Sequence, residues 1–181
     1  KKKFDENIKQ LEEDIAREKE VIEKTREDIQ KAVPAELKER IEKTSSFDQI
    51  LETINAHQKD IESKQEEINH EREHLQIQNK LKEFTTELEH GKPCPLCGAT
   101  EHPDILDTED VKSQQEEVLT KKKQLQDFMK KLSDFKEKVT AAKSTEKQTQ
   151  SRIEGLSKRL QENKNKLNAH FKDFINFTKA L

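Results

Sequence analysis

Hydrophobic residues recur every seven positions along two long stretches of the chain, one before residue 90 and one after residue 106. In a helix this spacing, with a companion apolar position in each heptad, is typical of a coiled-coil seam. The repeats are Ile8, Ile15, Ile22 and Ile29, then Phe47, Ile54, Ile61, Ile68 and Leu75, and finally Val111, Val118, Leu125, Leu132, Val139, Ile153, Leu160, Leu167, Phe174 and Leu181. They predict an all-α fold with helical arms at 1–89 and 107–181, joined by a loop at 90–106.

The first arm is interrupted near 33–46, where Pro34 lacks the amide hydrogen that a continuous helix needs. A short helical piece is expected to follow, with Leu37 and Ile41 on one face. The helix then restarts at Ser46, which is followed three residues later by Gln49 in the spacing of a capping box.

Two helices joined by a short loop run antiparallel, so we expect the arms to form an intramolecular coiled coil. Pro34 and Gly155 lie at similar distances from the loop, one in each arm, and this predicts a joint where the two weak points meet. Because the first arm is the longer one, its extra residues are expected to lie around the interruption.

Close to the loop the apolar pattern of the first arm shifts to a new stripe, made by Ile77, Leu81, Phe84 and Leu88. We expect the helix to end at His90–Gly91, because glycine readily adopts the left-handed conformation that follows a helix end. Asp107 is expected to cap the start of the second arm.

Composition excludes a compact globular core, because only 29% of the residues are hydrophobic and 40% are charged. Acidic and basic residues are interleaved, which favours solvated helix faces over a nucleic-acid groove. No apolar run is long enough to cross a membrane. The chain begins with Lys1 and stops within its heptad pattern, so we expect it to be part of a longer protein.

The candidate chemistry lies in the loop, where Cys94-Pro95-Leu96-Cys97-Gly98 contains both cysteines of the chain. Two thiolates at this spacing can bind one side of a Zn²⁺ ion, which takes four ligands in a structural site. Since one chain supplies two cysteines, the simplest complete site is a homodimer in which Cys94 and Cys97 of both copies share one Zn²⁺. Two cysteines without others also favour a reducing, intracellular compartment.

Two alternatives use the same loop. His90 and His102 could complete a Cys₂His₂ zinc site within one chain, although four ligands within thirteen residues would strain a short turn. A redox-active dithiol is the other alternative, but such pairs usually lie at a helix N-terminus in a βαβ unit, which this sequence does not predict.

A third zinc motif lies in the first arm, where His70-Glu71-Arg72-Glu73-His74 matches the H-E-x-x-H pattern of zinc proteases. Such a helix is normally buried beside a substrate cleft, whereas charged residues occupy the two central positions here. His70 and His74 also fall beside the apolar seam rather than on it. We interpret the match as a chance feature of a segment rich in glutamate and histidine.

The loop, in its position between two heptad arms, resembles the zinc hook of the SbcC family. These are bacterial SMC-like ATPases of DNA double-strand-break repair that act with the nuclease SbcD. The matching residues are Pro93, Cys94, Pro95, Leu96, Cys97, Gly98, His102 and Pro103. The resemblance implies that Cys94 and Cys97 bind zinc, that the arms are coiled coil, and that two hooks join as a homodimer.

For the longer protein, the resemblance implies a head that hydrolyses ATP, contacts an SbcD-like nuclease and DNA, and belongs to an ATP-dependent double-strand DNA exonuclease. It also implies a cytoplasmic, nucleoid-associated location. Glycine occurs only at positions 91, 98 and 155, so the chain lacks the G-x-x-x-x-G-K-[ST] phosphate loop. We therefore expect no enzymatic activity in this segment.

Overall fold

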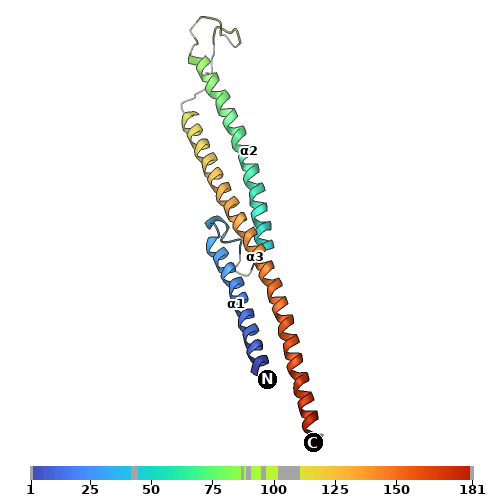
Figure 1. The fold of residues 1–181 in the computed structure, drawn as a ribbon. Helices are drawn as coiled ribbons and strands as arrows, with labels where there is room; N and C mark the ends of the chain where they lie inside the picture. Colours follow the sequence, from blue (N-terminus) through green and yellow to red (C-terminus); the bar gives the residue numbers. More distant parts are fainter. Residues whose placement is uncertain are drawn as a thin grey trace. The chain divides into compact units, whose positions relative to one another are not determined.

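The computed structural model describes residues 2–41, 45–86, 88, 91–94, 97–101 and 111–179. They form three α-helices and one 3-10 turn, namely α1 (Lys2–Ala32), η1 (Ala35–Leu37), α2 (Phe47–Thr86) and α3 (Val111–Lys179) (Figure 1). The described residues include no strand, which confirms the predicted all-α class. None of the helices in these ranges is both long enough and apolar enough to span a membrane.

The chain divides into two compact units. The first contains Lys1–Thr53 and Asp134–Leu181, and the second contains Ile54–Ser133. Both α2 and α3 contribute residues to each unit.

In the first unit, α1 lies alongside the C-terminal part of α3 and runs in the opposite direction (Figure 1). Three ion pairs between the helices establish this direction: Glu12–Lys164 at 2.8 Å, Glu18–Arg152 at 3.8 Å and Arg26–Glu146 at 2.6 Å. The residue number rises along α1 as it falls along α3. Because these pairs are largely solvent-exposed, they define the register and contribute little stability.

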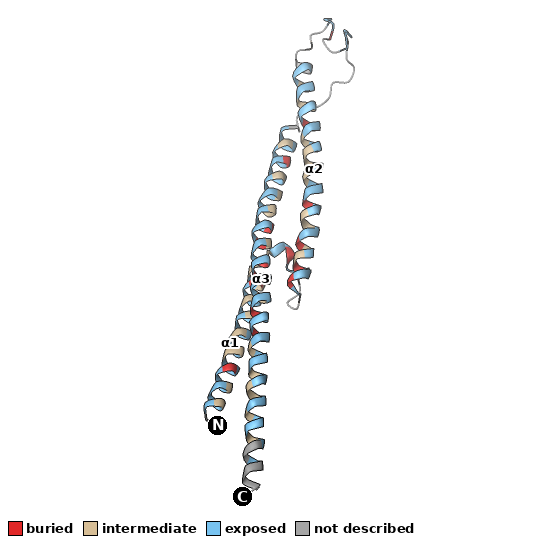
Figure 2. Ribbon diagram, turned by 45° about the vertical axis from the view of Figure 1, so that its right-hand side comes forward, coloured by how far each residue is buried: buried red, intermediate tan, exposed pale blue. Residues whose placement is uncertain are grey.

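The first unit buries apolar residues at the interruption of the first arm. Leu37 is 0% exposed and Ile41 is 5% exposed, and η1 carries Leu37 into the core as the sequence predicted. The amide of Leu37 donates to the carbonyl of Pro34 at 2.9 Å, and the amide of Ile41 donates to the carbonyl of Leu37 at 3.0 Å. Figure 2 shows the buried residues gathered around η1 and the start of α2.

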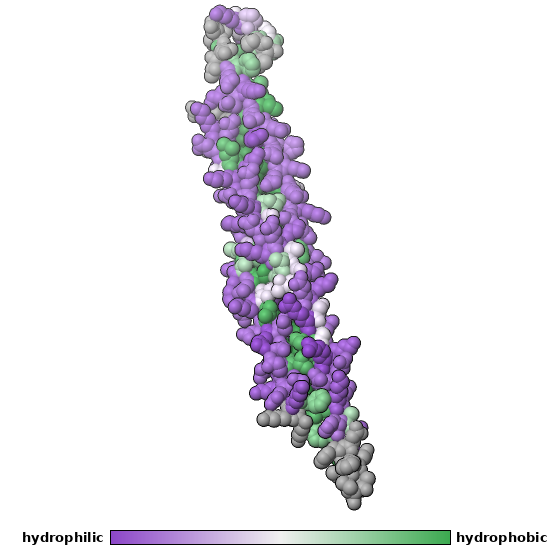
Figure 3. Space-filling view, in the orientation of Figure 1, coloured by the Kyte–Doolittle hydropathy of each residue, from purple (hydrophilic) through white to green (hydrophobic). Residues whose placement is uncertain are grey.

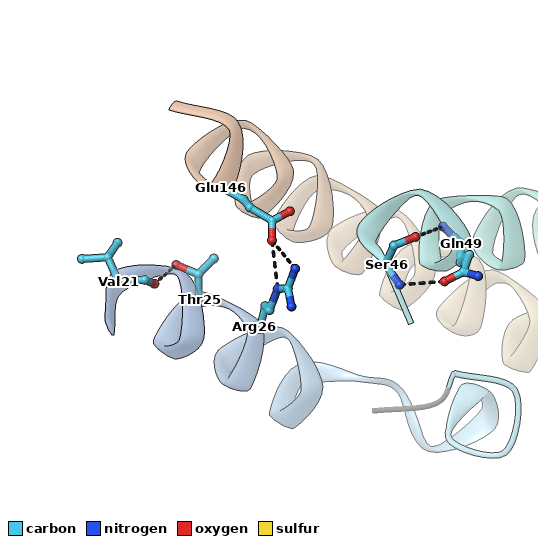
Figure 4. A network of polar contacts seen from close by, with 6 residues as sticks. All are labelled: Val21, Thr25, Arg26, Ser46, Gln49 and Glu146. Carbon is cyan, nitrogen blue, oxygen red and sulfur yellow. Dashed lines mark hydrogen bonds and ion pairs between the residues drawn. The ribbon is translucent and has the colours of Figure 1, made fainter. Parts of the chain in front are cut away.

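The predicted capping box is present at the start of α2 (Figure 4). The Ser46 amide donates to Gln49 Oε1 at 2.8 Å, and the Gln49 amide donates to Ser46 Oγ at 3.3 Å. Each side chain thus satisfies a backbone donor that the first helical turn leaves without an intrahelical acceptor.

Replacing Ser46 by alanine is expected to destabilise the first unit by about 0.5–2 kcal/mol, because the Gln49 amide loses Ser46 Oγ as its acceptor at the helix start. Chemical denaturation followed by circular dichroism measures this difference. Glu52→Ala, at an exposed position of α2 in the same unit, is the control. A Ser46 variant as stable as the control would show that the cap contributes nothing.

The predicted joint opposite Gly155 is wrong. The helix α3 continues through Gly155 without interruption for 69 residues. Glycine costs about 1 kcal/mol in a helix but keeps its amide hydrogen, so it weakens the helix without breaking it as proline does. Gly155 instead lines a surface groove of about 590 Å³ together with Asp14, Glu18 and Arg152.

Lys143 and Glu146 of α3 bind residues on either side of the interruption. Arg26 from α1 binds Glu146 (Figure 4), and Asp48 from α2 binds Lys143. Two positions of the first arm that are 22 residues apart therefore contact a single turn of α3. The extra residues of the first arm lie between them, as its greater length predicted.

In the second unit, α2 and α3 also run antiparallel. Lys122 Nζ donates to Asn69 Oδ1 at 3.1 Å, and Gln115 Nε2 donates to the Leu75 carbonyl at 3.4 Å. Leu75 and Val118 form a buried cluster, and Ile68 packs against it. The predicted seam positions on this part of α2 are thus buried or half-buried.

The helix α2 ends at Thr86, earlier than the predicted end at His90–Gly91. Two consecutive threonines close the helix, and β-branched residues have low helix propensity. Gly91 has a φ of 81°, the left-handed conformation predicted for it. The predicted cap Asp107 lies outside the described residues.

Candidate metal centre

The loop contains a tight turn closed by two backbone hydrogen bonds on Cys94. The Cys94 amide donates to the Ala99 carbonyl at 2.9 Å, and the Gly98 amide donates to the Cys94 carbonyl at 2.8 Å. The two bonds bring the backbone of Gly98 and Ala99 back to Cys94. Both thiols belong to one small, hydrogen-bonded unit.

Gly98 allows this reversal. Its φ is 75°, a conformation that L-amino acids with a side chain rarely adopt. A Cβ at this position would meet no atom within 4 Å, so the requirement for glycine comes from the backbone and not from crowding.

The two thiols differ in exposure. Cys94 is 7% exposed and Cys97 is exposed, and these two described cysteines form no disulfide. Cys94 is therefore covered by its own chain, whereas Cys97 lies at the surface.

The donor set suits half of a tetrahedral zinc site. Thiolates are preferred zinc ligands, and a turn that carries two of them fits one half of a Cys₄ arrangement. Among the residues that the structure describes, no group of three or more His, Cys, Asp or Glu side chains is placed to hold a metal ion. His90 and His102, the predicted alternative ligands, lie outside the described residues.

The H-E-x-x-H residues lie on an exposed face of α2. The His70 side chain is 83% exposed, and its Nδ1 is 4.0 Å from a carboxylate oxygen of Glu73. Glu71 and His74 are exposed as well. Their side chains are exposed like most other charged side chains along α2.

Sequence reasoning missed the role of Ala99, whose carbonyl accepts the hydrogen bond that closes the cysteine turn. No side-chain signal could have identified it, because the contact is made by backbone atoms that every residue has. The one clue in the sequence is that Ala99 follows the second cysteine by two positions.

Comparisons of the chain with protein-family models, curated proteins and solved structures found no match. The likeness to the zinc hook is therefore carried by the residues of the loop and by the heptad arms.

Proposed function

We propose that this chain is a zinc-dependent dimerisation module, in which Cys94 and Cys97 of two copies bind one shared Zn²⁺. The observation that carries the proposal is the closed turn from Cys94 to Ala99, which joins two thiols on a short hydrogen-bonded loop. One turn offers two ligands and zinc takes four. A second copy supplies the missing pair with the same geometry, since a two-fold axis repeats each contact.

Zinc supplies the binding strength of this interface. Structural zinc sites in finger peptides have apparent binding free energies of about 10–16 kcal/mol at neutral pH. A contact made by two short turns can therefore be stable although it is small. The exposed position of Cys97 leaves its thiol accessible to a second copy.

The helices on either side are proposed to form one antiparallel coiled-coil hairpin with the hook at its end. This proposal rests on the heptad repeats and on the antiparallel contacts within each unit, such as Asn69–Lys122 and Glu12–Lys164. The segment itself contributes tethering and not catalysis.

In the longer protein, the hook would link two SMC-like DNA-repair complexes, or the two arms of one complex. The resemblance to the SbcC family supports this wider role. In this wider role the longer protein has an ATPase head, outside this segment, that binds an SbcD-like nuclease and DNA in the cytoplasm. The proposed alternative is a monomeric Cys₂His₂ loop with His90 and His102 as the other two ligands.

The proposed function is tested by the mass of the chain in solution, measured by light scattering with zinc and with excess chelator. We expect a dimer with zinc, a monomer after chelation and a dimer again when zinc is restored. A monomer in saturating zinc, or a dimer that survives chelation, would contradict the proposal.

A double replacement of His90 and His102 by alanine separates the two zinc sites. The shared-cysteine site predicts that this variant still dimerises with zinc. Loss of zinc from the variant, with a monomeric parent chain, would support the Cys₂His₂ alternative. His70→Ala is the control, because its exposed side chain lies outside both sites.

A further inference from the structure

The last three turns of α2 carry a row of large hydrophobic side chains that are exposed. Ile77 is 59% exposed, Leu81 is 41% exposed and Phe84 is 40% exposed. We call these three residues the outer stripe. Figure 3 shows hydrophobic surface near this end of α2, on a molecule whose visible surface is otherwise mostly hydrophilic.

The outer stripe points away from the helix that α2 packs against. An α-helix turns by about 100° per residue, so positions 77, 81 and 84 lie roughly 180–240° around the axis from position 75. Leu75 packs on Val118 of α3. The outer stripe is therefore on the opposite face of α2, where α3 does not reach it.

The spacing of the outer stripe indicates what kind of surface fits it. Its residues are four and then three positions apart, the alternation that coiled-coil seams use to pack against a second helix. Lys80 and Glu83 lie beside the stripe and have opposite charges. Two copies of this face therefore do not repel each other through charges of one sign. The complementary partner is a helix with a short apolar stripe of the same spacing.

The position of the outer stripe identifies a second copy of this chain as that partner. Phe84 precedes Cys94 by ten residues, so in a dimer joined at the cysteine turns both outer stripes lie close to the point where the copies meet. Stable protein interfaces that lack a metal bury about 1,200–2,000 Å² in total, which is more than two short turns can provide. Zinc holds the two turns together although they are small, and the outer stripe adds apolar area beside them.

We propose that the outer stripe is a second contact of the zinc-joined dimer, in which the α2 helices of the two copies pack together along Ile77, Leu81 and Phe84. This inference rests on the proposed function, because zinc brings the two copies together at the turn. Zinc then determines which partner binds, and the outer stripe determines how tightly the helices next to the turn are held.

The test measures the dimer dissociation constant by sedimentation in saturating zinc for the parent chain, Leu81→Glu, Phe84→Glu and the double variant. We expect each single change to weaken the dimer by about tenfold, since it removes a buried apolar side chain from both copies. The double variant is expected to weaken it by about 100-fold. Zinc binding by the cysteines should persist.

The matched control is Val21→Glu, which introduces the same charge at a side chain of α1 that is 44% exposed. Helix content by circular dichroism, equal in all variants, shows that the exposed positions tolerate the change. If the parent dimerises with zinc and the stripe variants match the control, this inference is wrong and the proposed function stands. If the parent does not dimerise with zinc, the proposed function itself is wrong.

Discussion

Replacing Cys94 by serine is expected to remove zinc from the protein and to weaken the dimer by about 100-fold or more. In a symmetric site each replacement removes one ligand per chain, so the ion loses two of its four thiolates. A serine hydroxyl does not compensate, because zinc sites in proteins use thiolate, imidazole or carboxylate ligands. Zinc content by atomic emission, together with mass in solution, measures both effects.

The serine variant tests the effect of the metal alone, because the turn keeps its backbone hydrogen bonds. The Cys94 amide and carbonyl, and not its side chain, make the hydrogen bonds to Ala99 and Gly98. Cys97→Ser should give the same loss although Cys97 is exposed and Cys94 is buried. A Cys94 variant that still dimerised with zinc would exclude the shared thiolate site.

Replacing Leu37 by alanine is expected to destabilise the first unit by about 2–5 kcal/mol. Leu37 is 0% exposed, and hydrogen bonds to Pro34, Arg40 and Ile41 hold the backbone on either side of it. The neighbouring segments cannot easily move into the space that the lost side chain leaves. Urea denaturation followed by circular dichroism at 222 nm measures the change.

The control for Leu37 is Val21→Ala in the same unit, at a side chain that is 44% exposed. It should change the free energy of unfolding by about 0.5 kcal/mol or less, as surface substitutions usually do. Equal effects at the two positions would show that the interruption of the first arm is loosely packed. In that case it would act as a hinge and not as a packed core.

Local signals in this sequence predicted the structure well. The capping box of Ser46 and Gln49 and the positive φ of Gly91 each depend on a few neighbouring residues, and the structure has all of them. The buried face of Leu37 and Ile41 was also predicted from its spacing. In such short motifs the side chain itself satisfies the backbone or fills the core.

Predictions that compared distant parts of the chain were less accurate. The expected joint at Gly155 assumed that residues equally far from the loop in the two arms lie opposite each other. Arg26 and Asp48, however, contact the same turn of α3, so the residues between them add no length along that helix. The apolar spacing of Ile77, Leu81 and Phe84 predicted a stripe, but spacing alone does not identify what covers it. Exposure in the folded chain was needed to identify the stripe as an unpaired surface.

The most direct test of the shared zinc site is a native mass spectrum of the protein loaded with zinc, because one spectrum counts chains and metal ions in the same complex. A shared site predicts a species of two chains and one Zn²⁺, which separates into metal-free single chains when a chelator is added. A single chain that carries one Zn²⁺ of its own would contradict the shared site.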